Sequence, residues 1–269
     1  MQRALMTAIE QPGDARLDDF RALNDQRFRR RYEGDELFIA EGFVAIDRLV
    51  ESAHRVRAVL LAPSRLDRFA HTTELAARGV PLYVVEPDVI ADVVGFDLHR
   101  GVLAAADRLP PTSIDALPVS ARRLVVLEGL NDGENVGAIA RAAKAFGCDA
   151  LVVDSTCADP YSRRVVRVSM GEMLSMPIAR APDLSSACRW MDETGIETWA
   201  LTPTASAEDI WRCPVPRRLA LMVGAEGPGL STRTLGAARR RVRIPISPTV
   251  DSLNVGHATA IALAIVSRP

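Results

Sequence analysis

The sequence predicts an α/β protein built from two domains. Strand patterns alternate with helix patterns along the chain, and a proline-rich stretch divides the series in two. The chain has 269 residues, which is enough for two domains of ordinary size. With 48% hydrophobic and 25% charged residues, its composition is that of a globular protein with a normal core.

The first half contains an arginine-bearing helix, then strands and helices in turn. The predicted elements are a helix at about 16–35, a strand at 36–42, a helix at 43–53, a strand at 56–63, a helix at 64–79, a strand at 81–86, a helix at 87–95 and a strand at 101–108. In the helix at 64–79, Ser64 is the expected N-cap and Gly79 the expected stop. Pro87 suits the first turn of its helix.

The second half repeats this alternation after a break. Residues 109–120 hold three prolines and little apolar periodicity, which is typical of a linker. The predicted elements beyond it are strands at 124–129, 150–154, 197–203, 218–226 and 241–247, and helices at 136–147 and 252–267. We therefore expect an α/β domain at 1–106, a linker at 107–120 and a second α/β domain at 121–269.

Charge and cysteine content narrow the function classes. The net charge is −1, so no global positive field indicates a nucleic-acid partner, although a local patch remains compatible with one. Cys148, Cys157, Cys188 and Cys213 have no metal-ligand spacing with the histidines, so we expect free thiols and no metal. No apolar run resembles a secretion signal or a membrane span, so a cytoplasmic location without membrane attachment is expected.

Three polar segments of the second half lie where a strand ends, which is where α/β sheets bind ligands. The segments are Asn131–Gly137, Gly224–Leu230 and Ile244–His257. Asn135 opens a helix, and Arg141, six residues later, is expected to project toward the same edge. Taken singly, each segment is equally compatible with a capped helix or a tight connection.

The glycines of the second segment permit close backbone approach to a ligand. Their spacing does not match the dinucleotide fingerprint, and Pro228 removes one N–H donor. The region about 20 residues further on also lacks the acidic residue that binds a ribose. A dinucleotide-dependent oxidoreductase is therefore disfavoured.

In this order, the three segments resemble the motifs of the SpoU-type (TrmH-like) RNA 2′-O-ribose methyltransferases of the SPOUT superfamily. The resemblance covers about 121–269 and includes Asp159–Ser162 and Arg167–Gly171. The first half resembles the accessory substrate-binding domain more loosely, at 27–42 and 99–108. The resemblance implies a C-terminal SPOUT domain with a deep trefoil knot and a smaller N-terminal α/β domain that binds RNA.

The resemblance also implies a cofactor and an assembly. S-adenosylmethionine would bind in a bent shape, and the chain would form a homodimer through its C-terminal domain. The residues matching backbone positions that grip the adenosine are Gly224, Ile244 and Leu253. Adjoining cofactor-binding candidates are Leu201, Thr202, Glu226 and Ile246.

The implied reaction is transfer of a methyl group to a ribose 2′-hydroxyl. Arg141 matches the essential arginine of the family, either as a general base or as a clamp on the target phosphate that polarises the hydroxyl. A guanidinium stays protonated in proteins, which favours the clamp. The other catalytic candidates are Asn135, Glu226, Ser252 and Asn254, whereas the role of His257 stays open.

The resemblance assigns RNA selection to the N-terminal domain. Its candidate phosphate contacts are Arg27, Arg29, Arg30 and Arg31, with Arg141 in the second domain. Ribosomal RNA is slightly favoured over transfer RNA, and neither the RNA nor the nucleotide follows from the sequence. Two alternatives remain, namely an RNA-binding SPOUT-fold protein without catalysis and a SPOUT base methyltransferase.

Overall fold

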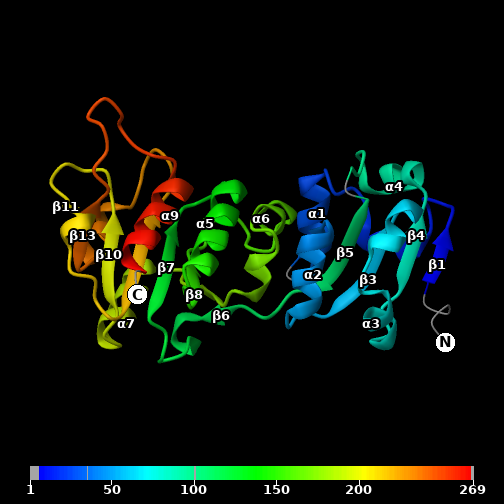
Figure 1. Cartoon of the computed structure of the whole chain (residues 1–269), viewed down its shortest axis with the longest axis horizontal. Helices are drawn as coiled ribbons and strands as arrows, with labels where there is room; N and C mark the ends of the chain where they lie inside the picture. Colours follow the sequence, from blue (N-terminus) through cyan, green and yellow to red (C-terminus); the bar gives the residue numbers. More distant parts are fainter. Residues whose placement is uncertain (1–5, 35, 100, 268–269) are drawn as a thin grey trace. The chain divides into compact units, whose positions relative to one another are not determined.

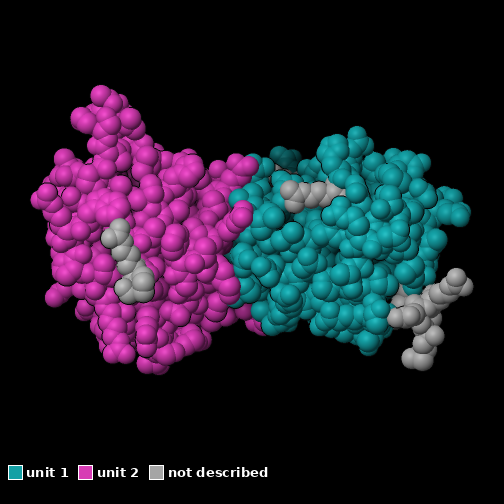
Figure 2. All heavy atoms as spheres, viewed as in Figure 1, with its two compact units in different colours: residues 1–109, 161–175 teal, residues 110–160, 176–269 magenta. Residues whose placement is uncertain are grey.

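The computed structural model describes residues 6–34, 36–99 and 101–267, and within them not the side chains of residues 26, 30 and 31. The chain forms two compact units, coloured separately in Figure 2. Unit 1 comprises residues 1–109 and 161–175, and unit 2 comprises residues 110–160 and 176–269. Both units are α/β, as predicted (Figure 1).

Unit 1 contains a five-stranded sheet of order β1-β4-β3-β5-β2. Its strands are β1 (Met6–Ile9), β2 (Leu37–Glu41), β3 (Val56–Leu61), β4 (Leu82–Val85) and β5 (Val102–Asp107), with β5 antiparallel to both neighbours. Alternate side chains point to opposite faces of a strand. In β2, Phe38 and Ala40 therefore join one buried cluster, while Leu37 and Ile39 join the other.

The helical segments in the described residues of unit 1 before residue 110 are η2 (Ala15–Phe20), α1 (Gln26–Glu33), α2 (Phe43–Glu51), η3 (Pro63–Arg68), α3 (Thr72–Ala77) and α4 (Pro87–Val94). The single helix predicted at 16–35 is wrong, because Ala22 has a positive φ of 49° and Asp25 caps a new helix. The helix predicted at 64–79 also begins too early. Ser64 lies inside η3 and caps nothing, and α3 starts after His71.

Residues 161–175 pack on unit 1, although the predicted division places them in the second domain. They form α6 (Arg163–Val168) and η5 (Glu172–Ser175), and Val166 and Leu174 are buried in the cluster that contains Phe38. The carboxylate of Glu41 accepts hydrogen bonds from Arg163 (2.9 Å) and Arg167 (3.2 Å). Residues 161–175 therefore belong to unit 1, because they make apolar contacts with its buried cluster and ion pairs with Glu41 of β2.

Unit 2 contains an eight-stranded sheet that is parallel throughout, of order β11-β13-β10-β12-β7-β8-β9-β6. Its strands are β6 (Thr112–Ser113), β7 (Arg123–Glu128), β8 (Ala150–Val153), β9 (Ile178–Arg180), β10 (Glu197–Leu201), β11 (Glu208–Asp209), β12 (Leu219–Gly224) and β13 (Arg240–Arg243). The predicted linker contributes edge strand β6 and the 3-10 turn η4 (Ile114–Ala116). It is therefore not a structureless segment.

The helical segments of unit 2 are α5 (Gly133–Ala145), α7 (Leu184–Glu193), η6 (Ile210–Arg212), α8 (Thr232–Ala237) and α9 (Val255–Val266). Helices α5 and α9 pack side by side, as Figure 1 shows. Gly256 of α9 faces α5, since a Cβ there would lie 3.4 Å from the Cβ of Ala138, an ordinary van der Waals distance. The trefoil knot stays a prediction.

Candidate functional site

A cavity of about 510 Å³ lies beyond the carboxyl ends of β10, β12 and β13, which are neighbours in the sheet. This volume falls in the range of small-molecule sites. The lining residues are Leu201, Thr202, Pro203, Val223, Gly224, Ala225, Glu226, Gly227, Gly229, Ile244, Ile246, Asp251, Ser252, Leu253, Asn254, Val255 and Ala258. The carboxyl edge of a parallel sheet is the expected place for a ligand.

The turn after β12 folds back tightly over its own strand. Ala225 and Gly229 form a bridge, in which the N–H of Gly229 donates to the carbonyl of Ala225 at 2.9 Å. A Cβ on Gly224 would lie only 2.2 Å from the backbone carbon of Gly229. Glycine at 224 is therefore a steric requirement of this wall of the cavity.

Polar side chains from the three sequence motifs meet beside the cavity. The amide nitrogen of Asn254 donates to Oδ1 of Asn135 at 2.8 Å and to Oε1 of Glu226 at 2.6 Å. Oδ1 of Asn254 accepts from the N–H of His257 at 3.1 Å, which caps α9. Asn135 is only 8% exposed, so its bond to Asn254 satisfies a buried polar group. We call Asn135, Glu226 and Asn254 the polar cluster.

All seven predicted cofactor residues line the cavity. They are Leu201, Thr202, Gly224, Glu226, Ile244, Ile246 and Leu253, and the catalytic candidates Ser252 and Asn254 join them. Leu201, Gly224 and Ile244 are at least 20 residues apart in sequence, but they line one cavity because β10 lies between β12 and β13 in the sheet. The roles of these residues stay predictions.

Arg141 does not lie at this cavity, contrary to the expectation from its spacing. It is absent from the lining residues, and its side chain is exposed on α5. Six residues along a helix correspond to about 9 Å of rise and to about 240° of rotation, so Arg141 faces away from Asn135. Within the described chain, no hydrogen bond or ion pair holds its side chain.

The charges at the cavity are acidic. Glu226 and Asp251 are the two ionisable residues among those that line it, and both are carboxylates. The sequence motifs did not single out Asp251, although it directly precedes Ser252. This lining favours a ligand that carries positive charge.

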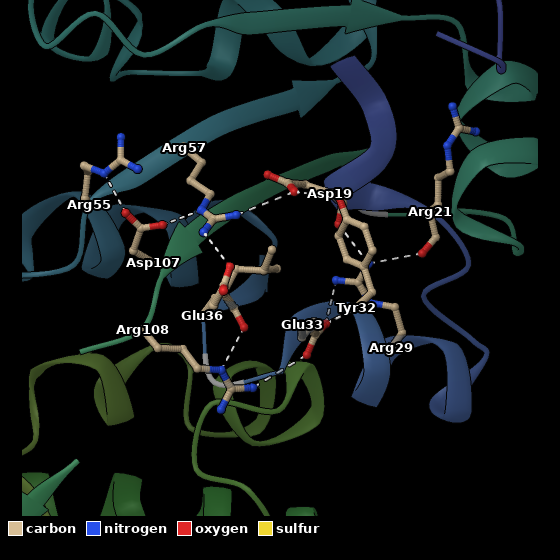
Figure 3. Close-up of polar contacts among 11 residues, drawn as sticks. Asp19, Arg21, Arg29, Tyr32, Glu33, Glu36, Arg55, Arg57, Asp107 and Arg108 are labelled. Carbon is tan, nitrogen blue, oxygen red and sulfur yellow. Dashed lines mark hydrogen bonds and ion pairs between the residues drawn. The ribbon is translucent and has the colours of Figure 1, made fainter. Parts of the chain in front are cut away.

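The arginines predicted to contact RNA have different environments in unit 1. Arg29 is only 6% exposed, and its guanidinium bonds to Glu33 (2.6 Å) and to the carbonyls of Asp19 (2.9 Å) and Arg21 (3.2 Å), as Figure 3 shows. A guanidinium that is buried and held by these groups is not exposed to a phosphate, so the structure does not support the prediction for Arg29. Arg27 is exposed. The side chains of Arg30 and Arg31 lie outside the described part of the structure.

Cysteine and metal chemistry find no support among the described residues. Burial raises the pKa of Cys148 to about 12 and that of Cys157 to about 12, so both thiols stay protonated. All four cysteines are free. Within residues 6–34, 36–99 and 101–267, no group of three His, Cys, Asp or Glu side chains is placed to hold a metal ion, and no helix is long and apolar enough to span a membrane.

Similar sequences come from RNA-modifying enzymes. A model of the SpoU rRNA Methylase family matches residues 122–264. A Mycobacterium tuberculosis protein named as an uncharacterized tRNA/rRNA methyltransferase is 44% identical over 268 residues, which cover 96% of this chain and 89% of that protein. A 23S rRNA (guanosine-2′-O-)-methyltransferase of Nitrosomonas europaea is 31% identical over 230 residues, which cover 82% of this chain and 88% of that protein.

Solved structures share the whole architecture. The AdoMet-bound rRNA methyltransferase of Sinorhizobium meliloti has a TM-score of 0.82 at 25% identity, covering 98% of both chains. The SpoU methyltransferase AviRb of Streptomyces viridochromogenes, in complex with AdoMet, has a TM-score of 0.77 at 24% identity, covering 94% of this chain and 97% of that one. At 24% identity, the similarity to AviRb shows only that the two chains share a fold.

Proposed function

Because the chain belongs to the SpoU rRNA methylase family, we propose that it transfers a methyl group from S-adenosylmethionine to a ribose 2′-hydroxyl of structured RNA. Family membership makes the chain an RNA methyltransferase. Ribosomal RNA is the favoured substrate, since relatives about 30% identical are named as 23S rRNA 2′-O-methyltransferases. The observation that carries the proposal is the polar cluster, which joins the three motifs at the cavity.

The cavity fits S-adenosylmethionine in size, lining and charge. Leu201, Ile244 and Leu253 give it apolar walls, and the turn at Gly224 brings backbone groups to its edge. The cofactor carries a positive sulfonium and an ammonium group, which match the carboxylates of Glu226 and Asp251. When bound, the cofactor supplies an electrophilic methyl group.

In the proposed reaction, the ribose oxygen would take the methyl group from the sulfur of the cofactor, and the hydroxyl proton would leave to solvent or a nearby base. The chain must align the hydroxyl and exclude other orientations. Asn254 is held rigidly by its bonds to Asn135 and Glu226. We assign Asn254 and Ser252 to shaping the ribose site, and Asn135 and Glu226 to fixing Asn254.

Arg141 serves as the clamp on the target phosphate. Its exposed position outside the cavity of its own chain requires another surface to bring it to the reacting ribose. Small and apolar side chains are exposed on α5, which carries Arg141, and on α9, which packs against α5. The exposed or half-exposed members are Ala138, Ala142 and Ala145 of α5 and Ala260, Ile261 and Ala264 of α9, which we call the α5/α9 patch. We assign this patch to a homodimer contact, which places Arg141 between the two copies.

The proposal is tested by methyl transfer from labelled S-adenosylmethionine to total RNA from a strain that lacks this gene, followed by nucleoside analysis. We expect label in one 2′-O-methylnucleoside of the ribosomal fraction. Arg141→Ala should lower kcat by about 10²- to 10³-fold, because a charged group that stabilises the transition state is lost. Arg122→Ala is the matched control, since Arg122 is exposed at the opposite, amino end of β7 and should keep full activity.

Other results of this experiment would support one of the alternative functions. Label on a base would replace ribose methylation with base methylation on the same fold. Label in transfer RNA alone would keep the reaction and exclude ribosomal RNA as its substrate. If calorimetry detects no binding of S-adenosylmethionine, the chain is an RNA-binding protein without catalysis. Full turnover by Arg141→Ala would remove Arg141 from the mechanism.

A further inference from the structure

Two aromatic rings are exposed on α1 of unit 1. Phe28 and Tyr32 lie one helical turn apart and are each 38% exposed. Their rings are stacked, with centroids 5.6 Å apart and planes inclined by 12°. Exposed aromatic rings are the surface on which nucleobases stack.

The position of Tyr32 is fixed from two sides. Its hydroxyl donates to Asp19 at 3.1 Å, and the guanidinium carbon of Arg29 lies 5.5 Å from the ring centroid. Arg29 is itself anchored by Glu33 and by backbone carbonyls, as Figure 3 shows. Burial raises the pKa of Tyr32, so the hydroxyl stays protonated and keeps donating. The rings are therefore held in place before any ligand arrives, which lowers the entropy cost of binding.

The charged residues of α1 indicate which kind of ligand would bind beside Phe28 and Tyr32. Its eight residues include four arginines and one glutamate. That glutamate, Glu33, is paired with Arg29 and with Arg108, and the carboxylate of Asp25 accepts from the N–H groups of Arg27 and Phe28. The acidic groups are thus engaged within the protein, while Arg27 is exposed next to Phe28. Aromatic rings on a helix whose sequence holds more arginines than acidic residues fit a polyanion with flat bases.

We propose that Phe28 and Tyr32 form a stacking platform for unpaired bases of an RNA, with Arg27 binding the adjacent phosphate. The proposal rests on the proposed function, which supplies RNA as the substrate. It adds that the RNA presents a single-stranded loop or bulge to unit 1. Bases inside a duplex are already stacked and cannot reach the platform.

The first test compares binding of a labelled single-stranded oligoadenylate and of an RNA duplex of equal length to the full chain, by fluorescence anisotropy. Phe28→Leu and Tyr32→Leu should each weaken single-strand binding by roughly 5- to 150-fold, the range expected for one lost base stack. Phe28→Tyr and Tyr32→Phe keep a ring and should bind nearly as the parent does. Leu109→Ala is the control, because Leu109 is a 39% exposed apolar residue elsewhere in unit 1.

Salt dependence separates stacking from charge. Leucine variants should keep the slope of log affinity against log salt, because stacking releases no counterions. Arg27→Gln should reduce that slope by about 0.7, the value for one phosphate of a single strand. A second measurement avoids variants altogether. An oligonucleotide carrying 4-thiouridine should cross-link to Phe28 or Tyr32 on irradiation, as located by mass spectrometry.

The outcomes distinguish this inference from the function it rests on. If the chain methylates RNA but the leucine variants bind single strands as the parent does, the platform is refuted and the function stands. Equal affinity for duplex and single strand, or cross-links confined to other residues, would also overturn it. If the parent chain neither binds nor methylates RNA, both proposals fail.

Discussion

At the scale of single residues, the site depends on positions that tolerate no substitute for steric or hydrogen-bonding reasons. Gly224 has no room for a Cβ against the backbone of Gly229. Asn254 uses both ends of its amide, donating to Asn135 and Glu226 while capping α9. An aspartate at 254 would keep the cap and lose the donor. A substitution at Gly224 or Asn254 is therefore expected to change the cavity and to destabilise the fold at the same time.

Gly224→Ala should disturb both the fold and the cavity. A Cβ 2.2 Å from the carbon of Gly229 forces the turn after β12 to move, which we expect to lower the free energy of unfolding by about 1–3 kcal/mol. Affinity for S-adenosylmethionine should fall as well. Urea unfolding and calorimetry measure the two effects.

Gly236→Ala is the matched control for this prediction. A Cβ on Gly236 meets nothing within 4 Å, and the residue lies in α8. Alanine should raise the free energy of unfolding by up to about 1 kcal/mol through helix propensity and leave cofactor affinity unchanged. Equal behaviour of the two variants would contradict the steric argument.

At the scale of elements, the segment 161–175 shows that chain order and spatial order differ. Helix α6 follows β8 of unit 2 in sequence, yet Val166 and Leu174 complete the buried cluster of unit 1. Tyr161 stacks on Phe38 with ring centroids 5.3 Å apart. Glu41, which is 6% exposed at the end of β2, provides the charge that binds α6. Unit 1 is therefore incomplete without residues that lie far along the sequence.

Glu41→Gln should loosen the attachment of α6 to β2. Removing the charge leaves Arg163 and Arg167 without their carboxylate, and we expect the free energy of unfolding to fall by about 1.5–3 kcal/mol. Glu51→Gln is the control, because the Glu51 side chain is 65% exposed and pairs with Arg48 at 3.3 Å. That exposed pair should contribute less than about 1 kcal/mol. Urea denaturation curves decide the prediction, and a loss no larger than that of the control would contradict it.

At the scale of the whole molecule, we propose that the reaction takes place in a homodimer. The cavity, the polar cluster and Arg141 all belong to unit 2, but Arg141 is exposed on α5 and does not line the cavity. Apolar side chains such as Ile261, which is 36% exposed, are suited to a second copy packing on the patch. A substitution that breaks the proposed homodimer should therefore also abolish methyl transfer.

Ile261→Asp should convert the proposed homodimer to a monomer and abolish most methyl transfer, because a charge in an apolar contact stays desolvated and unpaired. Light scattering after size exclusion measures the mass. Val119→Asp is the control, since Val119 is 77% exposed elsewhere in unit 2 and should leave mass and activity unchanged. A parent chain that runs as a monomer, or an active monomeric variant, would refute this assembly.

The sequence determined the α/β class, most strand positions and the identity of the motifs. Buried strands such as β7 and β12 are continuous apolar runs, and helix starts such as Pro87 carry local signals that need no tertiary context. Local signals failed where caps and turns override periodicity, as at Ala22 and Asp25. Strand β1 (Met6–Ile9) is also not predicted from the sequence.

Only the tertiary structure decided which of the motif residues meet. Sheet order placed Leu201, Gly224 and Ile244 around one cavity, since non-consecutive strands lie side by side. Arg141 faces away from that cavity because of its position on the helix α5. Arg29 is buried and bonded to other groups of the protein. Packing likewise moved residues 161–175 to the first unit. A sequence encodes residue types and local periods, whereas contacts between distant segments depend on how the sheet orders its strands.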